Sequence, residues 1–133
     1  MKVGDSMECF KWLEKVLKVT WQRSYKVYES GPIFIPSGGK IKMYVKLING
    51  YWECGALLCE GRFPITIKIS SKGGSIISEQ DCVFKLYQNY GEGSKDIEIS
   101  IPFNDQYKLI IEVNTQKSYN AKATIKLDAE ICK

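Results

Sequence analysis

The sequence has no histidine among its 133 residues. Histidine is the side chain that most often transfers protons near neutral pH, and it is also the usual base for serine and cysteine nucleophiles and a common metal ligand. Its absence argues against catalysis, although carboxylates, lysine and tyrosine remain available for acid-base chemistry. We therefore expect a protein that is not an enzyme. Catalysis without histidine is a third hypothesis, after the two binding functions given below.

Long apolar runs are also missing. The segment ALL inside CGALLC is representative of their length, whereas a membrane-spanning helix needs roughly 18 apolar residues and a secretion signal about 7 to 15. We therefore expect no transmembrane segment and a cytoplasmic location. The SGG and SKGG segments do not match the pattern of a phosphate-binding loop, so we expect no cofactor.

Charge is unevenly distributed along the chain. The net charge is +4, and residues 1–46 hold nine basic and four acidic residues, against ten and eleven in the remainder. This excess biases the protein toward acidic partners, but it is smaller than the clustered charge of dedicated nucleic-acid binders. With 44% hydrophobic residues, the chain is long enough to bury a core as a single soluble domain.

The N-terminal segment has the apolar spacing of a helix. Asp5 is a suitable N-cap, with Glu8 as its capping-box partner. We predict a short amphipathic helix over Ser6–Leu17, packed on a β-sandwich domain that covers residues 18–133. A membrane surface or a partner groove is the alternative location for its apolar stripe. The stripe consists of Cys9, Trp12, Leu13, Val16 and Leu17.

From residue 19 onward the apolar period changes to two, which is typical of strands with one buried face. Alternating runs occur at 19–27, 40–48, 63–69, 82–86, 97–101, 107–113 and 121–127. Turn-forming residues separate them, and Asn49-Gly50 in particular predicts a type I′ hairpin. Since no helical pattern lies between the strands, we predict a mainly β fold, an antiparallel two-sheet β-sandwich of about seven or eight strands.

Two segments of the C-terminal half resemble a known family. They are FPITIKISSKGGSIIS (63–78) and IEISIPFNDQYKLIIEVNTQKSYNAKATIKL (97–127). They contain a glycine-punctuated strand pair, a Y-x-L-x-x-x-x-N strand formed by Tyr107, Leu109 and Asn114, and a last alternating strand. This pattern resembles the closing strands of GOLD-type and related jelly-roll binding domains. The resemblance implies a jelly-roll-like binding or adaptor module without catalysis, and it assigns no functional residue.

The five cysteines allow more than one kind of chemistry. Only Cys54 and Cys59 are close in sequence, whereas structural zinc prefers four thiolates from two close pairs. We therefore expect structural cysteines at Cys54, Cys59 and Cys82. They are expected to be buried reduced thiols, with one or two disulfides as the alternative, ahead of a zinc site. Cys59 has no histidine to activate it, so a nucleophilic role is not expected.

One strand face combines basic and aromatic side chains, and a preceding strand adds more of both. Such a face could hold a phosphate backbone while a ring stacks on a base, although a solvated lysine face is the commoner arrangement. Asp96 and Glu98 likewise point to one side of a later strand. The candidate anionic-partner face consists of Arg23, Lys26, Tyr28, Lys40, Lys42, Tyr44 and Lys46.

These features favour a non-enzymatic β-sandwich that acts through protein-protein interaction. Its role would be that of an adaptor, an accessory binding module or a small assembly subunit. We expect a protein partner or self-association near the exposed edge strands. The alternative is a nucleic-acid or anionic-surface binder that uses the basic and aromatic face.

Overall fold

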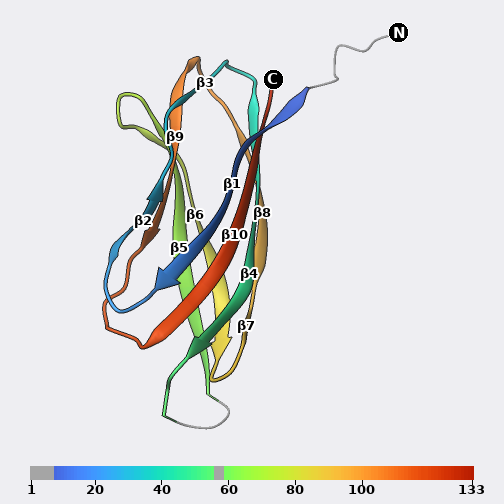
Figure 1. The fold of residues 1–133 in the computed structure, drawn as a ribbon. Coiled ribbons are helices and arrows are strands. Elements are labelled where there is room, and N and C mark those ends of the chain that lie inside the picture. The colour runs from blue at the N-terminus through green and yellow to red at the C-terminus, as the bar shows by residue number, and fades with distance from the viewer. Residues whose placement is uncertain (1–7, 56–58) are drawn as a thin grey trace.

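The computed structural model describes residues 8–55 and 59–133, and the regular elements in these ranges are all β-strands (Figure 1). All strand pairings are antiparallel, and the strands form two sheets. The predicted two-sheet β-sandwich is therefore confirmed. The strands are β1 (Cys9–Thr20), β2 (Tyr25–Glu29), β3 (Ile33–Ile35), β4 (Lys40–Trp52), β5 (Glu60–Ser71), β6 (Ile76–Tyr87), β7 (Gly91–Glu92), β8 (Ser94–Ser100), β9 (Asp105–Val113) and β10 (Ala121–Cys132).

The first and last strands of the chain are neighbours. One sheet, called sheet A, has the order β1-β10-β4-β8, and the other, called sheet B, has the order β2-β9-β5-β6-β7. The short strand β3 pairs with the start of β9. Because β1 and β10 lie side by side over their whole lengths, both ends of the described chain emerge at the same end of the sandwich (Figure 1).

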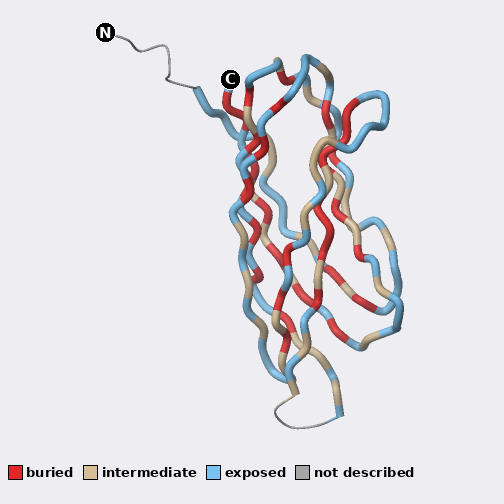
Figure 2. The backbone as a smooth tube through the Cα atoms, turned by 180° about the vertical axis from the view of Figure 1, so that it is seen from behind, coloured by how far each residue is buried: buried red, intermediate tan, exposed pale blue. Residues whose placement is uncertain are grey.

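The hydrophobic core lies between the two sheets, and its buried residues recur along the strands of both (Figure 2). On β4, Ile41, Met43 and Val45 are at most 3% exposed, while Lys42 and Tyr44 between them face outward. The predicted alternation of apolar and polar residues is thus confirmed on this strand. Trp21, which is 1% exposed, is among the largest fully buried side chains.

The predicted N-terminal helix over Ser6–Leu17 is wrong where the structure describes it, because Cys9–Leu17 belong to β1. Residues 1–7, which include the proposed N-cap, lie outside the described ranges. The expected domain boundary between residues 17 and 18 falls inside the same strand. None of the described residues forms a helix long and apolar enough to cross a membrane.

A β-bulge, together with a lysine at an inward-facing position, explains why β1 has the apolar spacing of a helix. The register with β10 shifts between Lys11 and Leu13, so Trp12 is an extra residue without a direct partner. Both Trp12 and Leu13 pack against the core. The added residue places Trp12 and Leu13 three and four positions after Cys9. The rest of the helical spacing arises because Lys15 takes an inward-facing position opposite Leu127, whereas Val16 faces outward and is 63% exposed.

The predicted hairpin at Asn49-Gly50 is also wrong, since β4 runs through both residues to Trp52. Glycine is needed at position 50 for close packing rather than for a turn. A Cβ atom at Gly50 would lie 3.0 Å from the Lys122 carbonyl oxygen on β10. The chain reverses between β4 and β5 instead, after a second bulge that leaves Ile48 as the extra residue.

The alternating run predicted over residues 19–27 spans two sheets. Val19 lies on β1 in sheet A, whereas Tyr25 and Val27 lie on β2 in sheet B. Trp21 lies in the connection between them, where its backbone N–H donates to the Ala121 carbonyl at 3.3 Å. The connection is thus fixed where the chain crosses from one sheet to the other.

Candidate functional site

The outer face of sheet A is divided by charge. The end nearer the described chain termini, called the acidic half, carries five carboxylates and three lysines. The opposite end, called the basic half, carries four lysines and, among the described residues, no carboxylate. The acidic half consists of Glu14, Asp96, Glu98, Asp128 and Glu130 with Lys11, Lys40 and Lys42, and the basic half consists of Lys18, Lys46, Lys122 and Lys126.

The division follows from the register of the strands, because residues directly opposite one another form rows across the sheet. The last row of the acidic half runs from Glu14 through Asp128 and Tyr44 to Asp96. The next row, the first of the basic half, runs through Lys126 and Lys46. A shallow hollow of about 310 Å³ lies in the acidic half, and one of about 390 Å³ lies in the basic half.

Lysines of the acidic half are partnered by its carboxylates. Lys40 and Lys42 place their Nζ atoms 3.5 and 3.9 Å from the two carboxylate oxygens of Glu98. Lys11 donates a hydrogen bond of 2.9 Å to Glu14, and this contact, followed by that with Lys126, lowers the pKa of the Glu14 carboxyl. Each of these exposed pairs contributes little stability, but together they offset the positive charge at this end.

Three of the four lysines of the basic half lack such compensation. Lys126 and Lys46 lie directly opposite each other on β10 and β4, an unfavourable arrangement for like charges. Lys126 itself is 3.4 Å from Glu14 and 4.0 Å from Asp128, both at the boundary of the acidic half. Within the described ranges, Lys18, Lys46 and Lys122 form no ion pair. The basic half is therefore a site of uncompensated positive charge.

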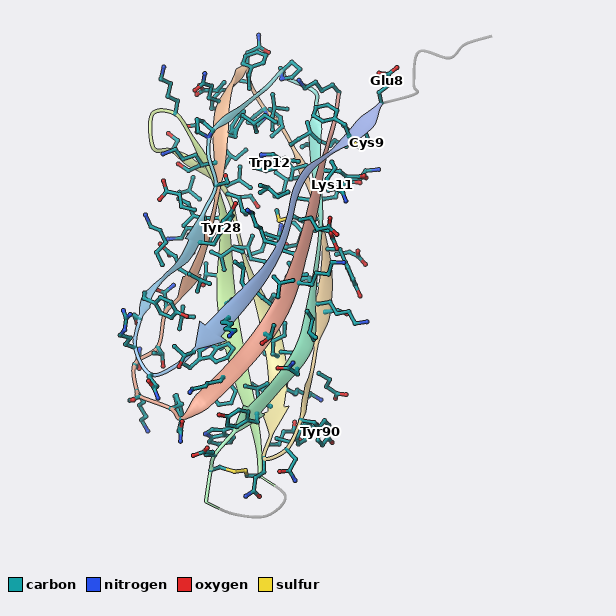
Figure 3. All side chains as sticks on the ribbon, in the orientation of Figure 1. Glu8, Cys9, Lys11, Trp12, Tyr28 and Tyr90 are labelled. Atoms are coloured by element: carbon teal, nitrogen blue, oxygen red, sulfur yellow. A yellow bond between two sulfur atoms is a disulfide. The ribbon has the colours of Figure 1, made fainter. Side chains whose placement is uncertain are left out.

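The residues predicted as the anionic-partner face do not lie together on one sheet. Those on β4, Lys40 to Lys46, alternate on the outer face of sheet A, and they are divided between the two halves. Lys26 is on β2, in sheet B. Tyr28 is on the same strand (Figure 3). Lys26 forms an ion pair with Glu29. Arg23 precedes β2 and lies over the Tyr25 ring, 4.8 Å from its centroid.

The basic half includes lysines that sequence reasoning did not select. Lys18, Lys122 and Lys126 come from β1 and β10, the two ends of the chain, and they lie beside Lys46 only because those strands are neighbours. Lys122, Thr124 and Lys126 alternate with apolar residues in the sequence, and this alternation indicated that they face outward. The sequence carried no signal for the order of the strands.

Both edge strands of sheet A carry a lysine at an inward-facing position. Lys15 on β1 lies opposite Leu127 and places its Nζ 5.8 Å from the centre of the Tyr28 ring in sheet B. Lys95 on β8 lies opposite Val45 and donates a hydrogen bond of 2.8 Å to the Asp81 carbonyl on β6. Inward-pointing charges on edge strands oppose pairing with a further strand, so the edges of sheet A are poor docking sites.

Four of the five cysteines form disulfides, Cys9–Cys132 and Cys54–Cys59. This is the alternative to the reduced thiols that we expected for Cys54 and Cys59. Cys82 is a buried free thiol on β6. Burial raises its pKa to about 11, so the thiol stays protonated at neutral pH and is a poor nucleophile.

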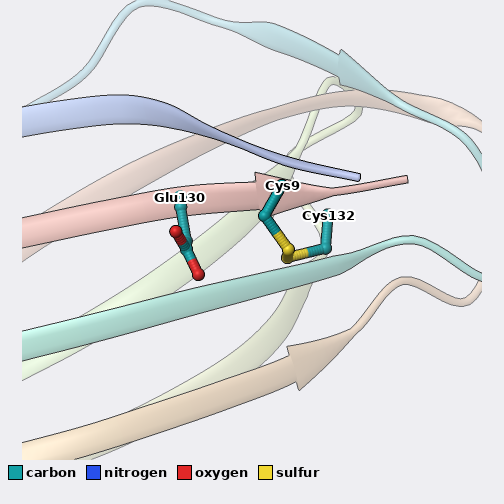
Figure 4. A group of neighbouring side chains, drawn as sticks. All are labelled: Cys9, Glu130 and Cys132. Carbon is teal, nitrogen blue, oxygen red and sulfur yellow. A yellow bond between two sulfur atoms is a disulfide. The ribbon is translucent and has the colours of Figure 1, made fainter. Parts of the chain in front are cut away.

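Cys9, Cys132 and Glu130 are the described residues whose ligand atoms lie close enough together to hold a metal ion, within 4.8 Å of one another (Figure 4). The two sulfur atoms are bonded to each other. A disulfide offers no thiolate to a metal ion, so the cluster acts in this form as a covalent link between β1 and β10.

Aromatic rings gather at the end of the sandwich where β4 leads into β5. Phe63 contacts Trp21, Trp52 and Tyr119, with ring centroids 5.2 to 5.4 Å apart. The cleft beside them has a volume of about 150 Å³, half of the roughly 300 Å³ at which ligand pockets begin. This cluster is therefore an extension of the core.

The sequence matches no family model and no curated protein. Among solved structures, the chain is similar to a chain in the structure of infectious bursal disease virus Gx strain, with 8% sequence identity and a TM-score of 0.46. The match covers 96% of this chain and 32% of that one, so the present chain spans about a third of the length of the viral chain.

Proposed function

We propose that this protein is a non-enzymatic β-sandwich that acts through protein-protein interaction, as an adaptor, an accessory binding module or a small assembly subunit. The observation that carries the proposal is the outer face of sheet A. This face spans four strands, and its acidic and basic side chains occupy separate halves. Apolar side chains are exposed between the charged ones. Val16 is 63% exposed and Ile48 is 51% exposed.

The strand order supports a jelly-roll arrangement of this sandwich. Without the short strands β3 and β7, eight strands remain, four in each sheet, in the orders β1-β10-β4-β8 and β2-β9-β5-β6. Two four-stranded sheets built from eight antiparallel strands are the architecture of jelly rolls, which serve in many binding and capsid proteins. The resemblance to GOLD-type domains stays a prediction.

The location of the protein also stays a prediction. Disulfides persist in oxidising compartments and in the cytoplasm of hyperthermophiles, whereas most other cytosolic proteins keep their thiols reduced. Two disulfides are therefore compatible with the expected cytoplasmic location if the source organism grows at high temperature.

Photo-crosslinking tests the proposed interaction. We expect a photoreactive amino acid at position 16 to form covalent adducts with one identifiable protein when the purified variant is irradiated in a lysate of the source organism. Position 83 is the matched control, because Val83 is an exposed apolar residue, 43% accessible, on β6 of sheet B. Absence of any protein adduct from position 16, or the same adducts from both positions, would contradict the proposal.

A nucleic acid or another anionic surface is the second candidate partner, and the unpaired lysines of the basic half favour it. A heparin column supplies the test. We expect Lys122→Glu to elute at lower salt than Lys42→Glu, because Lys42 is near Glu98 whereas Lys122 has no carboxylate partner among the described residues. If the unmodified protein is not retained at low salt, this second function is wrong.

A further inference from the structure

We propose that the partner of the outer face of sheet A is a second copy of this chain, packed face to face about a two-fold axis. This inference rests on the proposed function, since it names the partner for that interaction. Its basis is the division of the face into halves of opposite charge. Two copies can satisfy each other by placing the acidic half of one against the basic half of the other.

The symmetry follows from the position of the two halves along the strands. The two-fold axis would lie between sheet A of one copy and sheet A of the other, perpendicular to the strands. Rotation about this axis reverses the strand direction in the second copy. Each basic half, with four lysines, then faces an acidic half with five carboxylates and three lysines, and the contact forms twice. A two-fold interface uses the same patch on both copies, which is what this self-complementary pattern requires.

The face is large enough for a specific interface. The strands β1 and β10 have 12 residues each, β4 has 13 and β8 has seven. With strands about 4.8 Å apart and a rise of about 3.3 Å per residue, they cover roughly 700 Å². A standard protein interface buries about 800 Å² on each partner. Two sheets also pack readily face to face, with their strands within about 30° of one another.

Apolar side chains lie where the two copies would be closest. Val16 and Tyr44 occupy the two adjacent rows at the boundary between the halves, and they are 63% and 37% exposed. Ile48, the extra residue of the bulge in β4, is 51% exposed beside the basic half. Burying these three side chains supplies the apolar part of the contact, while the charges set its orientation.

The edges of the sheet do not offer a competing mode of self-association. Lys15 on β1 and Lys95 on β8 occupy inward-facing positions, as described above, and inward charges oppose edge-to-edge pairing. The face of sheet A is therefore the surface through which we expect two copies to associate.

A charge-reversal experiment tests the pairing of the halves. One variant, Lys18→Glu with Lys122→Glu, makes the basic half acidic. The other, Asp96→Lys with Glu130→Lys, makes the acidic half basic. We expect the unmodified protein to dimerise in sedimentation equilibrium at about 0.01 M ionic strength, where charges act over about 30 Å. Each variant alone should associate at least about tenfold more weakly, and an equimolar mixture of the two should recover a one-to-one dimer.

The matched control is Lys72→Glu with Lys117→Glu, which changes the net charge by as much as the first variant. Both lysines are exposed, one in the turn after β5 and one in the loop before β10. We expect this control to dimerise like the unmodified protein. A monomeric unmodified protein, variants that still dimerise alone, or a mixture that stays monomeric would overturn the proposal. If position 16 then crosslinks to a different protein, the proposed function stands and only the second copy is excluded.

Discussion

Replacing both Cys9 and Cys132 by serine is expected to lower the free energy of unfolding by about 5 kcal/mol. The disulfide joins residues 123 positions apart, so it closes almost the whole described chain into one loop. In the chain-entropy model, a crosslink stabilises by restricting the unfolded state, and the effect grows with the logarithm of loop length. Urea denaturation of the variant and of the unmodified protein, followed by circular dichroism, measures the difference.

The second disulfide provides the matched control. Cys54 and Cys59 are only five positions apart, and the same model gives about 2 kcal/mol for so short a loop. Losing Cys54–Cys59 should therefore cost less than half as much as losing Cys9–Cys132. Equal losses from the two double variants would show that loop length does not determine the contribution of either bond.

Replacing Trp21 by alanine is expected to cost about 4 kcal/mol. The side chain is 1% exposed and contacts the Phe63 ring, with 5.3 Å between the centroids. Its indole N–H donates a hydrogen bond of 2.8 Å to the Pro64 carbonyl oxygen on β5. Truncation removes buried apolar area, leaves a cavity and deprives that carbonyl of its donor.

Two further variants separate these effects. Trp21→Phe keeps a ring but loses the N–H donor, so it should cost about 1 to 3 kcal/mol, the usual penalty of an unsatisfied buried polar group. Phe34→Ala removes an aromatic side chain that is 51% exposed, and it should cost less than about 1 kcal/mol. Urea denaturation compares all three variants. A loss for Trp21→Ala as small as that for Phe34→Ala would contradict the role of Trp21 as a core residue.

The sequence was informative where one residue in two faces the core. The alternation on β4, β8 and β9 predicted which side chains are buried, because a strand between core and solvent requires that period. It failed at Trp12 and Gly50, where the same residue pattern arises from a different structural cause. The bulge at Trp12, together with the inward-facing Lys15 and the outward-facing Val16, imitates the helical period. Gly50 next to Asn49 looks like a turn, although close packing of β4 against β10 explains it.

The candidate site was harder to predict, because its composition depends on which strands are neighbours. The outward lysines of β4 were correctly assigned to one side of their strand. Whether that side is basic depends on β8, which supplies Asp96 and Glu98, and on β10, which supplies Asp128 and Glu130. These strands are separated from β4 by 40 residues or more of sequence. Local patterns contain no information on such pairings.

The bond between Cys9 and Cys132 also determines how the protein responds to mechanical force. Beyond it, Glu8 and Lys133 form backbone hydrogen bonds in both directions. Force applied at either end therefore passes through the disulfide into β1 and β10 together. Neither terminal strand can be peeled away alone. Unless the disulfide is first reduced, an unfoldase that pulls on one end must therefore separate β10 from β4, in the middle of sheet A, in a single step.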